Sequence, residues 1–174
     1  MCRHNVKLTI SLSHRFTTLD SLDDLFSRLR AATSPTEIEA LQDGIWQLWL
    51  TTGHPLLDKH LEAGMRALSA EEYTAAIREF SELITASPEY AEGWNKRATA
   101  YYLRGEYNAA LRDVRETLRL EPRHFGALSG WAAILRTIGD NRGALPVLLR
   151  LEKLCPAWPG LQNQLRDLRD ALEE

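Results

Sequence analysis

The stretch AEGWNKRATAYYLRGEYNAALRDVRETLRLEP, residues 91–122, decides the fold of this chain. Apolar residues recur at helical spacing in two parts of it, residues 91–103 and 106–120, and an Arg-Gly pair lies between them. Ala98 and Ala110 are small enough to let two helices approach closely, where larger side chains would push them apart. The closing proline has no backbone N–H and disfavours helical backbone in the residue before it. The stretch therefore predicts a helical hairpin.

The same pattern returns along the chain at a constant interval. A proline, an alanine and a small residue recur in this way, and the middle copy adds Trp94 and Tyr101 to fill the space between neighbouring units. The recurring positions are Pro88, Pro122 and Pro156; Ala76, Ala110 and Ala144; and Gly64, Ala98 and Ala132. One hairpin cannot bury its own apolar face, whereas stacked copies can. The interval therefore predicts an all-α solenoid built from three tandem hairpins.

This pattern resembles the tetratricopeptide-repeat family. Residues 91–122 carry that family's Trp, small residue, Tyr, Gly-x-Tyr, Ala, bulky apolar residue and Pro in order, and the resemblance extends from residue 57 to about 158. The phrases EGWNKRATAYYLRGEY and EPRHFGALSG are also similar to short bacterial members of the family, a similarity that does not imply one function. The resemblance implies a right-handed superhelix of helical hairpins, with nine helices once both ends are included.

Two positions depart from the family's pattern. Glu71 stands where the middle repeat has Gly105, so the first repeat has to close its turn without a glycine. Arg97 occupies a site that is more often Leu, and we expect its aliphatic stem to run along the neighbouring helix while its charge stays in water.

We expect the chain to divide into six segments. They are a flexible N-terminal tail (1–18), an N-terminal helical hairpin that is a degenerate repeat or cap (19–53), three repeats (57–90, 91–124 and 125–158) and a C-terminal capping helix (159–174). The leucines after Pro156 form one stripe on the last helix, which predicts a cap for the third repeat and a monomer. A short leucine-rich coiled-coil dimer is the alternative.

The N-terminal hairpin matches the repeat poorly, because Gln42 stands at the position of the repeated alanine. Ser34 and Glu37 flank Pro35 in the pattern of a capped helix start. The helix that follows carries tryptophans at residues 46 and 49, which are either a binding surface or core residues. We expect them to be core, packed on the first repeat, because tryptophans at helical spacing usually are.

Residues 1–18 contain Arg3, Lys7 and Arg15 and no acidic residue, which is the composition of an organellar presequence. Their apolar residues alternate with period two, however, and would not form an amphipathic helix. We therefore expect a loose tail, or a misassigned start, on a cytoplasmic protein, with a presequence as the alternative. No apolar run approaches the roughly 20 residues that span a membrane.

Composition and motifs do not indicate an enzyme. The 174 residues carry a net charge of −3, which disfavours a broad basic surface for nucleic acid. His54 and His60 have no Cys or carboxylate at metal-ligand spacing, and Cys155 has no histidine nearby in sequence. Paired acids such as Asp23-Asp24 fit helix starts better than acid-base catalysis. We expect no metal, no cofactor and no catalytic residues.

The resemblance implies a concave groove, lined by the first helix of each repeat, that holds an extended peptide or a helix of a partner protein. The expected groove residues are Leu61, Met65, Leu68, Asn95, Thr99, Tyr102, Ser129, Ala133 and Arg136. We expect Asn95 and Tyr102 to matter most, because they belong to the middle repeat. The alternative is that these faces are merely solvated. Chaperone-binding members of the family hold a C-terminal carboxylate with Lys and Asn, and here Leu61 and Met65 occupy those sites.

The sequence therefore predicts a protein-interaction scaffold that binds a protein or peptide. Two alternatives stay open. One is binding of the partner through the N-terminal hairpin, and the other is an RNA-binding array of the pentatricopeptide kind. The second fits less well, because that family's period is one residue longer and the groove helices here are not basic.

Overall fold

The computed structural model describes residues 21–158 and 160–173, so the expectations for residues 1–18 lie outside it. Over the described part the chain forms nine α-helices and no strand, which confirms the all-α fold. The helices are α1 (Leu22–Ala31), α2 (Pro35–Leu50), α3 (Pro55–Ser69), α4 (Tyr73–Ala86), α5 (Ala91–Leu103), α6 (Tyr107–Leu120), α7 (Phe125–Thr137), α8 (Asn141–Leu154) and α9 (Leu161–Glu173).

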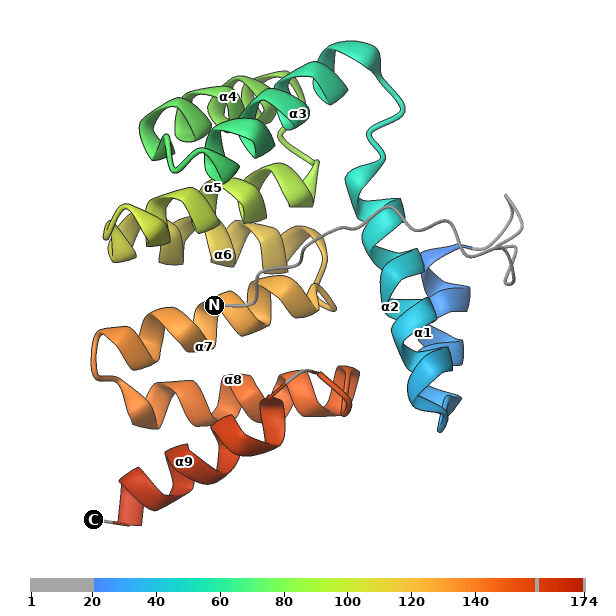
Figure 1. Ribbon diagram of the computed structural model, residues 1–174, viewed down its shortest axis with the longest axis vertical. Coiled ribbons are helices and arrows are strands. Elements are labelled where there is room, and N and C mark those ends of the chain that lie inside the picture. The colour runs from blue at the N-terminus through green and yellow to red at the C-terminus, as the bar shows by residue number, and fades with distance from the viewer. Residues whose placement is uncertain (1–20, 159, 174) are drawn as a thin grey trace.

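Six of the helices form three stacked hairpins, namely α3 with α4, α5 with α6 and α7 with α8 (Figure 1). The second helix of each hairpin packs on the first helix of the next. The first helices, α3, α5 and α7, also contact one another in order, so they form a continuous face of the array. This arrangement confirms the helical repeat inferred from the constant interval in the sequence.

The turns inside the three hairpins share one backbone feature. Glu71, Gly105 and Gly139 occupy equivalent positions in the three repeats and have φ angles of 61°, 84° and 82°. Glycine adopts this left-handed conformation freely, whereas other L-residues adopt it at a cost of roughly 1–2 kcal/mol. Glu71 thus closes the first turn in the same left-handed conformation as the two glycines, although it lacks the conformational freedom of glycine.

The recurring small residues lie where two helices of one hairpin meet. Ala76, Ala110 and Ala144 are completely buried. A Cβ atom on Gly64 would lie 2.3 Å from Cε1 of Phe80, so that position tolerates only glycine at this helix separation. The other recurring small residues, Ala98 and Ala132, are buried as well.

The other recurring positions lie at the edges of the packed units. Trp94 and Tyr101 of α5 are half-buried. The prolines follow the second helix of each hairpin; they are Pro88, Pro122 and Pro156.

Arg97 differs from the expectation. Its guanidinium does not reach into water but forms a two-pronged ion pair with Asp113 of α6, with Nε–Oδ2 at 2.7 Å and Nη2–Oδ1 at 3.0 Å. Nη1 also donates to Oγ of Ser81 on α4 at 3.0 Å, and the charge lies 5.0 Å from the ring centre of Trp94. Burial would lower the pKa of Arg97, but its bonds to Asp113 raise it above its ordinary value. The residue therefore joins the first repeat to the second.

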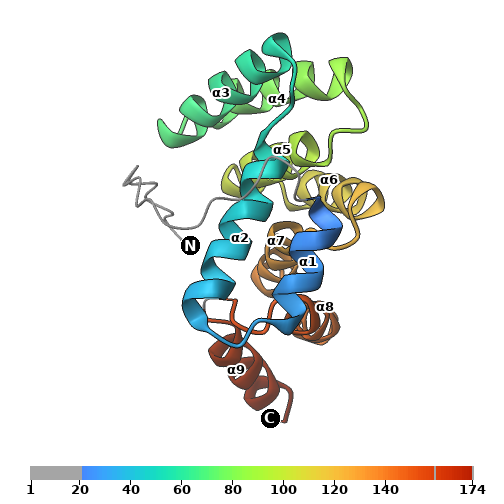
Figure 2. The same ribbon diagram turned by 90° about the vertical axis from the view of Figure 1, so that its right-hand side faces the viewer.

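The N-terminal hairpin does not continue the stack. Helices α1 and α2 lie along the side of the array instead of before α3 (Figures 1 and 2), and their buried side chains share one core with residues of α5 to α9. The expectation that Trp46 and Trp49 pack on the first repeat is therefore wrong. Their rings contact His124, the last residue of the second repeat, and Phe125, the first residue of the third. An apolar stripe predicts that a helix face is buried, but not which surface covers it.

Specific contacts fix the hairpin in this position. Trp49 is buried, as expected for a core residue, and its ring stacks on His124 with centroids 4.0 Å apart and an interplanar angle of 7°. The hydroxyl of Tyr90 donates to the backbone carbonyl of Trp49 at 2.6 Å. Nη1 of Arg123 donates to Oδ1 of Asp23 on α1, also at 2.6 Å.

The N-terminal caps of the two helices in this hairpin agree only partly with the caps expected from the sequence. Helix α2 begins after Ser34 as expected, but Ser34 makes no side-chain capping bond. The complete capping box is on α1, where Oγ of Ser21 accepts from the Asp24 amide at 3.2 Å and the Asp24 carboxylate accepts from the Ser21 amide at 3.1 Å.

At the other end of the chain, Leu161, Leu165 and Leu168 of α9 are buried in the main core. That stripe is thus used within the chain and is not free for a coiled coil.

Candidate protein-binding groove

The candidate groove is the face of α3, α5 and α7 that carries the nine expected residues. Thr99 and Arg136 are exposed on it, and a half-buried set lies around them: Met65, Leu68, Tyr102, Ser129 and Ala133. These seven residues form an accessible surface that is apolar on α3, mixed on α5 and basic at the end of α7. These seven are the accessible residues of the candidate groove.

Tyr102 occupies the middle of this surface and is fixed from two sides. Its hydroxyl lies 3.2 Å from Oγ1 of Thr137 on α7, and its ring centre lies 5.8 Å from that of Tyr107 on α6. Helix α5 therefore presents a half-buried aromatic ring whose orientation is set before any partner binds.

Two of the nine expected residues are not accessible. Leu61 is 6% exposed and belongs to the core between α3 and α4. Asn95 is 7% exposed, and its side-chain amide donates to Oε2 of Glu92 at 2.9 Å. The expected role of Asn95 in bonding a peptide backbone is therefore not open to it in this conformation, because its side chain is buried and one of its two amide N–H donors already bonds to Glu92.

A buried charged cluster surrounds Glu92, one turn before Asn95 on α5. The Glu92 carboxylate accepts from Nε2 of His124 at 2.8 Å and pairs with Nζ of Lys96 at 3.1 Å, and the Glu92 and His124 side chains are fully buried. Nδ1 of His124 accepts from the backbone amide of Ala127 and so caps α7, which leaves Nε2 as the protonated nitrogen. Burial alone would raise the pKa of Glu92, but Lys96 and His124 hold it below its ordinary value.

This cluster marks the point where α2 closes one end of the groove. Gly126 lies one turn before Ser129 on α7, and a Cβ atom there would lie 2.5 Å from Cη2 of Trp46. On α5, Nζ of Lys96 lies 5.5 Å from the centre of the same Trp46 ring. Helix α2 thus covers the start of α5 and α7 on the side that carries the groove residues, and the groove is open only beyond Asn95 and Ser129.

The described residues offer little for catalysis. No group of three or more His, Cys, Asp or Glu side chains among them could hold a metal ion. Cys155 is buried, and burial raises the pKa of its thiol to about 11, so the reactive thiolate is disfavoured. None of the described helices combines the length and apolar character needed to cross a bilayer.

Sequence reasoning missed Glu92, His124 and Gly126. The one available signal was Gly126, a glycine on an apolar helix at the position where the preceding repeat has Glu92. An isolated helical glycine indicates a close approach by another group, but it does not say which group approaches.

Comparison with known proteins agrees with this architecture. The protein-family model for the tetratricopeptide repeat matches residues 91–124. A TPR repeat-containing protein of Rhizobium etli is 34% identical over 151 residues, which are 87% of this chain and 74% of that protein.

Solved structures share the fold. The Sgt2 TPR domain from Aspergillus fumigatus has a TM-score of 0.65 at 21% identity, over 70% of this chain and 82% of that one. The first TPR domain of Spaghetti, bound to the HSP90 peptide SRMEEVD, has a TM-score of 0.62 at 23% identity, over 65% of this chain and 92% of that one. With the constant repeat interval, the stacked hairpins and a relative matched over most of both lengths, the chain belongs to the tetratricopeptide-repeat family.

Proposed function

We propose that this protein is a protein-interaction scaffold that holds an extended segment or a helix of a partner protein in the open part of the groove. The observation that carries the proposal is the fixed, accessible ring of Tyr102 at the centre of the face formed by the three first helices. The HSP90 peptide bound by the Spaghetti domain, which has the same fold, supports a peptide-binding role.

The chemistry of the open groove favours a particular kind of segment. Met65 and Leu68 offer apolar contact at one end, and Arg136 offers a positive charge at the other. Tyr102 supplies rigid amphipathic area between them, and aromatic residues near an interface centre dominate binding energy. A partner segment with an apolar residue at one end and an acidic residue at the other would match this order.

Site-specific photo-crosslinking in the native cell tests the proposal. A photoreactive amino acid is placed at Thr99 in the groove, and at Arg115, which is exposed on α6, as a matched control. We expect Thr99 to capture one defined protein that Arg115 does not capture. Tyr102→Ala should lower the affinity for that protein by about 2 kcal/mol, or about 30-fold, in a variant that circular dichroism shows to be folded.

Two results would contradict the proposal. One is equal capture from both positions. The other is a defined partner whose affinity survives Tyr102→Ala in a folded protein. Recovery of RNA at Thr99, with no protein, would favour the nucleic-acid alternative instead.

A further inference from the structure

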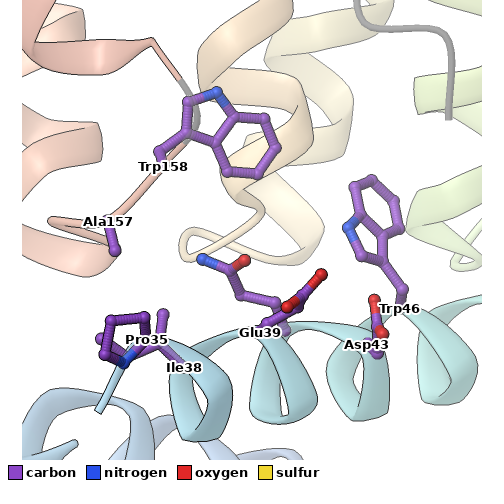
Figure 3. A pocket seen from close by; sticks show the side chains of 8 residues that line it. Pro35, Ile38, Glu39, Asp43, Trp46, Ala157 and Trp158 are labelled. Carbon is purple, nitrogen blue, oxygen red and sulfur yellow. The ribbon is translucent and has the colours of Figure 1, made fainter. Parts of the chain in front are cut away.

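A cavity of about 270 Å³ lies at the seam between helix α2 and the loop that joins α8 to α9. Trp158 comes from the loop and faces α2, from which Glu39, Asp43 and Trp46 rise toward it (Figure 3). Drug-sized ligands usually occupy pockets of about 300–1,000 Å³. This cavity is smaller, so a single side chain fits it better than a cofactor.

The two tryptophans are held in place from beneath. Each ring packs on Phe125, and each ring centre lies 5.3 Å from that of Phe125, which is completely buried. Gln42, which also lines the cavity, donates its amide N–H to Sγ of Cys155 and so ties α2 to the end of α8. The cavity walls are therefore set without a bound ligand.

Among the described residues that line this cavity, the charged side chains are Glu39 and Asp43. Helix α2, which forms one wall, contains three acidic residues, Glu37, Glu39 and Asp43, and no Lys, Arg or His. Glu39 and Asp43 are exposed at the cavity, and no basic side chain lines it among the described residues. Lys96 lies near the Trp46 ring, but it pairs with Glu92 and is not part of the lining.

We propose that this cavity receives an arginine side chain of a partner protein. A guanidinium is planar, stacks on indole faces and offers a fork of N–H donors that matches a carboxylate. Trp46 and Trp158 supply the faces, and Glu39 supplies the carboxylate. A lysine ammonium is more strongly hydrated and cannot stack, so it fits less well. Trp and Arg are also the residue types that most often dominate protein interfaces. This cavity borders the closed end of the groove at Trp46, but the proposal does not depend on the groove's function.

The test is an NMR titration of the whole chain with N-acetyl-arginine amide, which imitates an arginine within a peptide. The chain has five tryptophans, and their indole N–H signals report on the cavity directly. We expect saturable shifts for Trp46 and Trp158, with a dissociation constant on the order of millimolar, and none for Trp94 or Trp131. The uncharged isostere N-acetyl-citrulline amide should cause no saturable shift. Free arginine should bind no better than the capped form, because the two compounds share the guanidinium that makes the proposed contacts.

A matched pair of variants tests whether the carboxylate of Glu39 binds the guanidinium. Glu39→Gln should weaken binding of the capped arginine about threefold or more, whereas Glu37→Gln, on the same helix but not in the lining, should leave it unchanged. Both residues are exposed, so neither change should unfold the protein. Equal effects of the two variants, equal binding of citrulline, or unmoved signals of Trp46 and Trp158 would each overturn the proposal. Tighter binding of free arginine than of the capped form would overturn the assignment to a partner protein.

Discussion

Replacing Gly126 by alanine should weaken the contact between the N-terminal hairpin and the third repeat. The added Cβ would lie 2.5 Å from Cη2 and 3.1 Å from Cζ2 of Trp46, whereas ordinary contacts of this kind are 3.4–4 Å. The indole has to retreat by roughly 1 Å, but it is already packed edge-on against Trp49 and Phe125, with ring centres 5.3 Å away in both cases. Overpacking of this type costs about 1–3 kcal/mol.

Gly130 provides the matched control, because it lies one turn later on the same helix. A Cβ atom there meets nothing within 4 Å. Gly130→Ala should therefore stabilise the protein by up to about 1 kcal/mol, through helix propensity alone. Gly126→Ala has the same propensity gain at most, so the difference between the two variants isolates the clash with Trp46.

Urea unfolding followed by circular dichroism measures that difference. We expect Gly126→Ala to be about 1–3 kcal/mol less stable than Gly130→Ala. Hydrogen exchange should also show faster exchange of α1 and α2 in Gly126→Ala, while α3 and α4 stay unchanged. Equal stability of the two variants would show that Trp46 does not pack against Gly126 on α7, and would refute the described placement of α1 and α2.

Three further predictions follow from buried and groove positions. Ala110→Leu should overpack the contact between α5 and α6 and lower stability by about 1–3 kcal/mol, seen as a lower melting temperature; an unchanged melting temperature would contradict the repeat alignment. The pKa of Glu92 is lower in the folded than in the unfolded state. The ionised Glu92 therefore stabilises the fold at pH values above its unfolded pKa, and this stabilisation is lost as the pH falls through its folded pKa. Glu92→Gln should cost about 3 kcal/mol at neutral pH, because it removes the buried carboxylate that pairs with the half-buried Lys96. It should also flatten the loss of stability below about pH 5 in urea titrations; an equally steep loss would assign the pH dependence to other groups. Acidic C-terminal chaperone peptides should show no micromolar affinity by calorimetry, because Leu61 and Met65 offer no charge-assisted bond to a carboxylate; a clear titration would refute this.

The repeat itself could be predicted from sequence because its determinants are local. The regular recurrence of Ala76, Ala110 and Ala144 defines helix contacts within each hairpin, and all three alanines are buried there. The repeat alignment also predicted a first turn closed at Glu71 without a glycine, and the structure adds that Glu71 adopts the same left-handed backbone as Gly105. Close contacts between neighbouring elements leave a periodic signal in one chain.

Contacts between distant elements could not be predicted in this way. Arg97 pairs with Asp113, yet its position in the repeat indicated only a long side chain at a usually apolar site. The Asn95 amide donates to Glu92, and the buried Glu92 carboxylate in turn accepts from His124, the residue that caps α7. No interval or periodicity links such residues, because they meet only once the hairpins have stacked.

Because of the position of the N-terminal hairpin, the two ends of the candidate groove differ in how firmly their helices are packed. One core joins α1 and α2 to the second and third repeats, while most of the first repeat packs around a separate core that contains Leu61 and Phe80. The hairpin thus braces α7 through Trp46 and Trp49 and reaches α5 through Lys96, which lies over the Trp46 ring. Helix α3 is joined to α5 chiefly by way of α4. A partner segment would therefore meet a preset surface around Tyr102 and a less strongly braced surface on α3. Since ordering a surface on binding costs free energy, the specificity of this scaffold should lie with the braced half.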